Sequence, residues 1–448
     1  MNPLDTIYAL ASGSGMVALS VIRLSGDRSH LAVKALAGEL AVPRRCYLRA
    51  LRDPMTAEVL DRAMVIRFEA PASFTGEDGA EFHIHGGRAV QSGVLLALSR
   101  VGGLRLAEPG EFTRRAIRNN KMDLVEAEGL GDLLWAQTSG QRRQAMSQLL
   151  GEASSVFESW REQLLLIRAE IEAAVDFADE AGVAEAAQQG IDGGIQLLLS
   201  EMEQAVSRSA MASAIRDGVR VVLAGLPNTG KSSLLNALVR RDAAIVSAVP
   251  GTTRDAIEVF LDLGGIPVIL TDTAGLRDDV SDMVEAEGIR RSRTRMADAH
   301  VMVWVASPDV PGSEEYDQNA APDILVRNKC DTAESNSRLI RNEDSIRPHV
   351  MLSATTGEGV EGFLRILTDL SRQRFISEES PVVVTERQRL VTLEAIESLK
   401  KSATHGSGSL ELKAEDIRRA ADAVGRLTGR SDVEEWLGVI FSRFCIGK

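Results

Sequence analysis

Long apolar runs are missing from this chain, and so are the patterns that direct a protein out of the cytosol. Nowhere do about 18 consecutive apolar residues occur, so we expect no membrane span. The N-terminal stretch MNPLDTIYALASGSG has no basic segment before an apolar one and is not arginine-rich. Neither a signal peptide nor a transit peptide is therefore expected. Together these absences predict a cytoplasmic protein.

Cysteine is scarce, and basic residues are outnumbered by acidic ones. Cys46, Cys330 and Cys445 are an odd, scattered set, which excludes a disulfide framework or a CxxC metal site and fits a reducing compartment. The net charge is −13. Proteins that hold nucleic acid mainly through its phosphates usually carry a basic excess. The charge therefore argues against tight, self-sufficient nucleic-acid binding, although a local patch or a partner could supply the basic surface.

The chain changes character twice along its length. Residues 1–118 mix strand-like runs with turn-rich segments, which predicts a mixed α/β domain. Residues 119–214 contain no proline and carry a helical apolar stripe, and the chain becomes helical again after Pro381. Between the helical segments, strands and helices alternate as in a doubly wound parallel sheet. The alternatives are one helical domain interrupted by an inserted α/β domain, which we favour, and two unrelated helical segments. The predicted domains are 1–118 (N-terminal α/β), 119–215 with 375–448 (helical), and 216–374 (doubly wound α/β).

The strongest motif is a phosphate-binding loop at residues 225–232, GLPNTGKS, which matches GxxxxGK[ST]. It follows the apolar run 219–224 and precedes the helical segment 233–238, which is the context that the motif requires. Its glycine-rich backbone lets N–H groups converge on phosphates at a helix N-terminus. Lys231 is expected to reach the β- and γ-phosphates and to take part in catalysis, and the Ser232 hydroxyl is expected to bind Mg²⁺.

Later motifs predict specificity for guanine and a segment whose conformation changes when the γ-phosphate leaves. Residues 272–275 (DTAG) can hold the magnesium shell and meet a γ-phosphate, and Thr253 in 251–255 (GTTRD) is the natural second magnesium hydroxyl. The Asp331 carboxylate can accept two N–H groups of guanine, a kind of contact that can discriminate by roughly 10⁴–10⁵. The predicted GTP-binding residues are Asn228, Thr229, Gly230, Lys231, Ser232, Ser233, Ser247, Ala248, Val249, Pro250, Gly251, Thr252, Thr253, Asp272, Thr273, Ala274, Gly275, Asn328, Lys329, Asp331, Ser353 and Ala354.

Leu276 occupies the position where Ras-like GTPases place a water-orienting glutamine. Leucine cannot orient water, so another group must assist hydrolysis. Asn228 and the 251–255 segment are similar to those of potassium-activated GTPases. This resemblance implies a K⁺ ion in place of an arginine finger. Its ligands would be Asn228, Ser247, Val249 and Thr252, which offer oxygen atoms of a suitable type. The alternatives are that Asn228 only caps the loop, or that Arg254 or Arg277 supplies the cation.

Motifs along the whole chain resemble the MnmE (TrmE) family of tRNA-modification GTPases. They are 73–78 (SFTGED), 85–87 (HGG), 108–113 (EPGEFT), 120–123 (NKMD), 176–180 (DFADE) and the terminal 444–448 (FCIGK). The resemblance implies a water-orienting glutamate at Glu285, or at Glu287 if the alignment slips. It also implies an N-terminal domain that dimerises and binds a tetrahydrofolate derivative, in the 5-formyl or 5,10-methylene form, through Arg23, Glu81, Lys121 and Lys448. Cys445 is either a nucleophile or a packed residue.

The same resemblance implies the reaction and the partners. The family adds an aminomethyl or carboxymethylaminomethyl group at C5 of the wobble uridine of certain tRNAs, together with an FAD-dependent partner, MnmG. The implied assembly is a homodimer that forms a heterotetramer with that partner. Two other functions fit the GTPase motifs alone: a ribosome-assembly or translation GTPase, and a non-enzymatic GTP-dependent switch.

Overall fold

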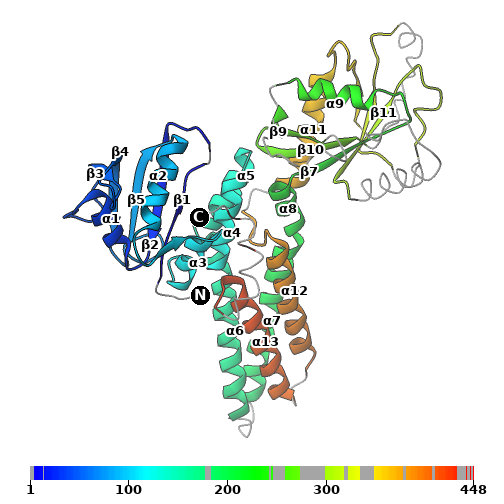
Figure 1. The fold of residues 1–448 in the computed structure, drawn as a ribbon. Coiled ribbons are helices and arrows are strands. Elements are labelled where there is room, and N and C mark those ends of the chain that lie inside the picture. The colour runs from blue at the N-terminus through cyan, green and yellow to red at the C-terminus, as the bar shows by residue number, and fades with distance from the viewer. Residues whose placement is uncertain are drawn as a thin grey trace, which may run out of the picture. The chain divides into compact units, whose positions relative to one another are not determined.

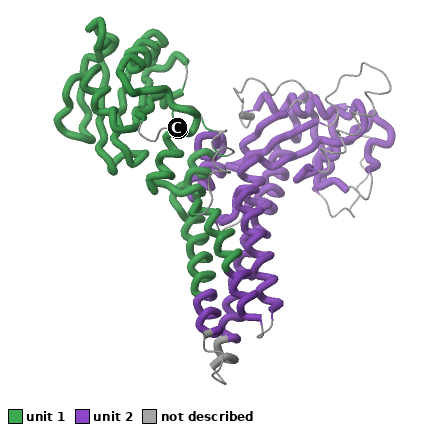
Figure 2. The backbone as a smooth tube through the Cα atoms, turned by 60° about the horizontal axis from the view of Figure 1, so that its bottom comes forward, with its two compact units in different colours: residues 1–131, 148–166, 418–448 green, residues 132–147, 167–417 purple. Residues whose placement is uncertain are grey.

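The computed structural model divides the chain into two compact units, which are described separately. The first unit contains residues 1–131, 148–166 and 418–448, and the second contains residues 132–147 and 167–417 (Figure 2). The structure describes residues 5–13, 15–176, 183–241, 244–245, 258–272, 298–316, 321–332, 348–376, 380–405, 409–430, 440, 444 and 447.

The first unit is built on a six-stranded sheet with the order β3-β4-β5-β2-β1-β6 (Figure 1). All neighbouring strands in it are antiparallel except β1 and β6. Its elements are β1 (Thr6–Leu10), β2 (Leu19–Ser25), α1 (Ser29–Ala37), β3 (Tyr47–Arg52), β4 (Val59–Phe68), β5 (Gly79–His85), α2 (Arg88–Ser99), β6 (Leu104–Leu106) and α3 (Glu111–Arg118).

Buried apolar residues alternate with more exposed, mostly polar residues along β2 and β5, so this sheet has one buried face and one polar face. Ile22, Leu24, Phe82 and Ile84 are buried in the core with residues of α1 and α2. Successive side chains of a strand point to opposite faces, so the intervening residues lie on the other face. Arg23 and Glu81 are directly opposite each other there, because the β2–β5 register pairs them. The sequence predicted strands in both segments, but it could not predict this pairing.

Helices occupy the part of the chain between the two sheets and the part that follows the second sheet. They are α4 (Leu124–Trp135), α5 (Ser139–Leu149), α6 (Glu152–Asp176), α7 (Val183–Ser207), α8 (Ser209–Asp217), α12 (Glu386–Thr404) and α13 (Leu410–Thr428). In the second unit α12 packs along α7. Thr385 and Gln388 form a capping box that satisfies N–H groups at the start of α12. None of the helices in the described part of the chain is long and apolar enough to cross a membrane.

The second unit contains a seven-stranded sheet with the order β13-β12-β11-β7-β10-β9-β8. Strands β13, β12, β11, β7 and β10 are mutually parallel, and β9 and β8 are antiparallel additions at one edge. Its elements are β7 (Val219–Ala224), α9 (Lys231–Val239), β8 (Ala244–Ile245), β9 (Glu258–Leu263), β10 (Ile266–Asp272), β11 (Val301–Ala306), β12 (Ile324–Arg327), β13 (His349–Met351) and α11 (Val360–Phe375).

The order of these strands creates a switch point at β7. The chain adds β10 on one side of β7 and later β11 on the other side. In open α/β sheets, ligands bind beyond the carboxyl ends of strands at such a point. The loops that follow β7, β10, β12 and β13 all leave this same edge, because these strands run parallel. The mixed α/β architecture and the P-loop sheet that the sequence predicted are therefore present.

Candidate functional site

The loop between β7 and α9 has the backbone shape of a phosphate-binding loop. Gly225 has φ 142°, and a Cβ atom there would lie 2.3 Å from the carbonyl oxygen of Val305. Gly230, with φ 90°, is the N-cap of α9, and a Cβ there would lie 2.2 Å from Nδ2 of Asn328. Both positions therefore require glycine. The loop turns tightly into the N-terminus of α9, where N–H groups and the helix dipole favour anions.

Lys231 lies beneath this loop and is 4% exposed. Its Nζ donates to the carbonyl oxygens of Gly225 and Leu226 at 2.9 and 2.8 Å. Burial lowers the pKa of Lys231, although the negative charge of Asp272 acts in the opposite direction. The ammonium therefore lies within the turn of the loop, as a phosphate-binding lysine must.

Ser232 and Asp272 form the contact that fits a magnesium ion. The Ser232 hydroxyl donates to Oδ2 of Asp272 at 2.6 Å, and Asp272 is buried at the end of β10. Hydroxyl and carboxylate oxygens are the hard ligands that Mg²⁺ takes beside nucleotide phosphates. These two residues are therefore suited to a magnesium ion: the Ser232 hydroxyl could bind it directly, and the Asp272 carboxylate could hold the ligands that surround it.

Asn328 connects the loop after β12, which the sequence predicts to read guanine, to the phosphate loop. Its Nδ2 donates to the carbonyl oxygens of Thr229 and Gly230 at 3.0 and 3.4 Å, and its Oδ1 accepts from the N–H of Ala354 at 3.0 Å. Asn328 is 2% exposed, so one buried amide holds loops that follow β7, β12 and β13. Asp331, three residues further on, is exposed. Its carboxylate can therefore meet a base from solvent.

Several predicted residues of this site lie outside the described residues, so their predictions stand as made. They are Ser247, Ala248, Val249, Pro250, Gly251, Thr252, Thr253, Arg254, Thr273, Ala274, Gly275, Leu276, Arg277, Glu285 and Glu287. The described members are Asn228, Thr229, Gly230, Lys231, Ser232, Ser233, Asp272, Asn328, Lys329, Asp331, Ser353 and Ala354, and the structure gathers them at one edge of the second unit's sheet.

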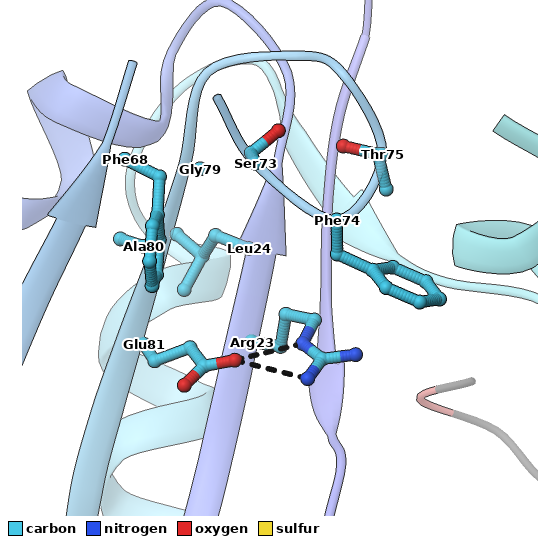
Figure 3. Close-up of a pocket in the computed structure, with 9 residues that line it drawn as sticks. All are labelled: Arg23, Leu24, Phe68, Ser73, Phe74, Thr75, Gly79, Ala80 and Glu81. Carbon is cyan, nitrogen blue, oxygen red and sulfur yellow. Dashed lines mark hydrogen bonds and ion pairs between the residues drawn. The ribbon is translucent and has the colours of Figure 1, made fainter. Parts of the chain in front are cut away.

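The first unit contains a separate pocket on the polar face of its sheet (Figure 3). Arg23 points toward Glu81 in it, and both its Nε and one terminal nitrogen lie 3.0 Å from Oε1 of Glu81. The other oxygen, Oε2, lies 3.2 Å from Nε2 of His83. The pocket is lined by Arg23, Leu24, Phe68, Ser73, Phe74, Thr75, Gly79, Ala80 and Glu81.

Aromatic rings flank the arginine in this pocket. The guanidinium carbon of Arg23 lies 5.1 Å from the centroid of the Phe74 ring and 6.0 Å from that of Phe112. A flat heteroaromatic ring system could stack on such a ring, while a carboxylate accepts N–H groups from its edge. Phe74 was not among the predicted ligands, although it lies within the 73–78 motif. The pocket therefore offers an aromatic ring face, a carboxylate and a guanidinium next to one another.

Lys121 and the C-terminal end lie near this part of the first unit. A Cβ atom at Gly76 would lie 3.1 Å from Cγ of Lys121, so the lysine stem lies against the loop that lines the pocket. A Cβ at Gly447 would lie 2.2 Å from the carbonyl oxygen of Leu10, at the end of β1. The neighbouring Ala9 opposes Arg23 in the β1–β2 register. Lys448 and Cys445 lie outside the described residues.

A charged network holds the pocket loop onto α3. Arg115 donates to Oε2 of Glu77 at 3.0 Å and to Oε1 of Glu111 at 3.1 Å, and Arg105 donates to both oxygens of Glu111 at 2.6 and 2.8 Å. Burial by itself raises the pKa of Glu111, but its bonds from Arg105, the Glu108 N–H and Arg115 bring it down to about 2. Glu111 is therefore ionised at neutral pH and anchors both arginines.

Comparisons with known protein families cover almost the whole chain. The family "MnmE helical domain" matches residues 124–445, and the family "GTP-binding protein TrmE N-terminus" matches residues 6–121. The N-terminal match precedes the helical one along the chain, in the order in which the N-terminal and helical regions were predicted.

Full-length relatives agree with these matches. The "tRNA modification GTPase MnmE" of Bradyrhizobium sp. (strain ORS 278) is 45% identical, over 100% of both chains. The mitochondrial 5-taurinomethyluridine-[tRNA] synthase subunit GTPB3 of Danio rerio is 43% identical, over 99% of this chain and 93% of that protein. The solved G domain of the T. maritima FeoB iron transporter is 26% identical and covers 35% of this chain and 99% of that chain. Its TM-score of 0.25 is too low to carry an argument.

Proposed function

The chain belongs to the MnmE (TrmE) family of tRNA modification GTPases and is a GTP hydrolase of tRNA modification, and from this premise we propose its specific reaction. With an FAD-dependent partner, MnmG, it adds an aminomethyl or carboxymethylaminomethyl group at C5 of the wobble uridine. It acts in the cytoplasm as a homodimer that joins the partner in a heterotetramer. The substrate is the wobble uridine within tRNA. The partner supplies part of the basic surface that binds the tRNA, which this acidic chain lacks.

The observation that carries the GTPase part of the proposal is the meeting of Ser232, Asp272 and Asn328 at one sheet edge. The Ser232 hydroxyl and the Asp272 carboxylate are 2.6 Å apart, and Asn328 bonds two carbonyls of the phosphate loop. In the proposal GTP lies along this edge, with its phosphates on the loop and its base at Asp331. Magnesium bound by Ser232 and Thr253 would neutralise charge on the phosphates.

Hydrolysis in this proposal uses potassium and a glutamate. A K⁺ ion held by Asn228, Ser247, Val249 and Thr252 would stabilise charge that develops between the β- and γ-phosphates, as preorganised cations do. Glu285 would orient the attacking water, since Leu276 cannot. Asn228 lies within the phosphate loop itself, next to where the phosphates are proposed to bind.

The folate part of the proposal places a tetrahydrofolate derivative in the pocket of the first unit. Glu81 would accept N–H groups of the pterin edge with Arg23 beside it, and Lys121 and Lys448 would meet the carboxylates. The folate would supply the one-carbon unit that becomes the C5 methylene group. The name of the Danio rerio relative supports this chemistry, because a 5-taurinomethyluridine also carries a methylene group on C5 of uridine.

Mass spectrometry of wobble uridines tests the reaction. Transfer RNA from a strain that lacks this chain should lose the C5-substituted uridines, and the wild-type gene should restore them. A gene with Asp272→Ala should not restore them, whereas one with Ser207→Ala should, because that exposed hydroxyl bonds only within its own helix. Unchanged wobble uridines in the deletion strain would remove the proposal.

A further inference from the structure

The ammonium of Lys329 bridges two loops that are far apart in the sequence. Its Nζ lies 2.9 Å from the carbonyl oxygen of Asn228 and 2.7 Å from Oδ2 of Asp309. Asp309 belongs to the loop after β11, and its other carboxylate oxygen accepts from the Ser307 hydroxyl. That loop is itself held in place, because the buried Ser313 hydroxyl donates to the carbonyl oxygen of Ser307 at 2.9 Å. Asp309 is therefore a fixed anchor for the lysine.

The lysine completes a clamp on consecutive carbonyl groups of the phosphate loop. Asn328 bonds the carbonyls of Thr229 and Gly230, and Lys329 bonds that of Asn228. In a trans peptide the C=O and the following N–H point in opposite directions. Clamping these carbonyls on one side therefore directs the N–H groups of residues 229–231 to the other side, which is where the phosphates are proposed to bind.

Asn228, like Lys329 with its φ of 62°, has a backbone conformation that needs support from surrounding contacts. Its φ of 64° is in the left-handed region, which residues other than glycine rarely adopt. Such a conformation persists when surrounding contacts determine it. The bond from Lys329 to its carbonyl is a contact of that kind, and Asp309 determines where the lysine lies.

We propose that Asp309 is a positioning residue for nucleotide phosphates: by holding Lys329 on the Asn228 carbonyl, it maintains the shape of the phosphate loop. This inference rests on the proposed nucleotide site. Asp309 touches neither the phosphate loop nor the base-reading carboxylate of Asp331 in its described contacts, so it acts through Lys329. Bonds from Lys329 and Ser307 lower the pKa of Asp309, which keeps it charged at neutral pH.

The same loop offers a matched control. Glu314 forms a salt bridge with Arg327 at 2.9 Å, and Arg327 immediately precedes Asn328. The two acidic side chains are similarly accessible, with 41% of Asp309 and 56% of Glu314 exposed. Glu314→Ala therefore removes a comparable surface ion pair without releasing the lysine that bonds the phosphate loop.

The experiment compares GDP binding by the full-length chain and its variants. Asp309→Ala should weaken GDP affinity roughly 5- to 10-fold, the scale of one lost charge-assisted contact. It should also speed GDP release, while Glu314→Ala should match the wild type. In a Lys329→Met background, Asp309→Ala should have no further effect, because the two residues act as one unit. Asp309→Asn, which keeps an acceptor oxygen, should show a smaller loss and serves as the readout if the alanine variant does not fold.

Two outcomes would overturn the inference. One is wild-type GDP affinity in Asp309→Ala, or in Asp309→Asn where only that variant folds. The other is a full loss that persists in the Lys329→Met background, because Asp309 would then act by another route. Failure of the wild-type chain to bind GDP at all would instead remove the proposed nucleotide site on which the inference rests.

Discussion

The hydroxyl of Ser232 lies 2.6 Å from the carboxylate of Asp272, although 40 positions separate them in the chain. This contact joins the first turn of α9 to the end of β10, and it places a hydroxyl and a carboxylate together where the proposed magnesium ion would lie. The nucleotide chemistry that we propose depends on that contact.

We expect Asp272→Ala to lower GTP turnover on the order of 10²-fold and to raise the magnesium concentration needed for half-maximal rate, because the metal stabilises transition-state charge. Turnover measured across a magnesium titration checks this. Ser207→Ala, an exposed helical serine outside the site, is the control. An unaltered magnesium dependence in Asp272→Ala would show that the carboxylate does not serve the metal.

Asp331→Asn should shift nucleotide preference from guanine toward xanthine. The Asp331 carboxylate only accepts hydrogen bonds, whereas an amide can donate to the additional carbonyl of xanthine. Binding of GDP and XDP to both proteins provides the measurement. Equal affinities of the variant and the wild type for both nucleotides would refute the assignment of Asp331.

Replacement of K⁺ by Na⁺ at equal ionic strength should lower the GTPase rate steeply, since the smaller ion does not span the same oxygens. A cation at that position can contribute roughly 10³–10⁵ in rate. Asn228→Ala should be slow in both salts. If Arg254 or Arg277 is the finger instead, the rate should not depend on the monovalent ion and should collapse in the matching Arg→Ala variant.

Glu81→Gln should weaken binding of 5-formyltetrahydrofolate at least about 10-fold, because a charged acceptor of the pterin N–H groups is lost. GTP turnover, which uses the other unit, should not change. Calorimetric titration of the full-length chain measures the affinity, and Glu58→Gln, on the exposed turn before β4, is the control. Folate affinity equal to that of the wild type would exclude Glu81 as the pterin acceptor.

The N-terminal sheet should lose stability in acid through Glu111. Its folded pKa of about 2 is below the ordinary value of 4.5. The contribution is therefore fully present above pH 4.5 and is lost as the pH falls toward 2. It amounts to on the order of 3 kcal/mol. The protection factors of the β1 amides, that is, their exchange rates corrected for the intrinsic pH dependence, should fall over that range in the wild type. Glu111→Gln should exchange faster at neutral pH and respond less to acid; a response equal to that of the wild type would exclude Glu111 as the source.

The features that are contiguous in the chain could be predicted from local patterns of residues. The apolar run 219–224 is strand β7, the glycine loop follows it, and the helical segment after it lies in α9. The run before Asp272 is β10, and the run before Asn328 is β12. Strand, turn and helix preferences act over neighbouring residues, so patterns of a few residues are enough to predict them.

Contacts between residues that are distant in the sequence, in contrast, depend on how the strands pair. Arg23 and Glu81 are 58 positions apart, and the β2–β5 register places them opposite each other; a slip of one residue would move one of them to the buried face. Asp309 belongs to no motif, and its role follows from the pairing of β11 with β12, which brings its loop to Lys329. Strand order and register are properties of the whole sheet, and no local pattern of residues specifies them.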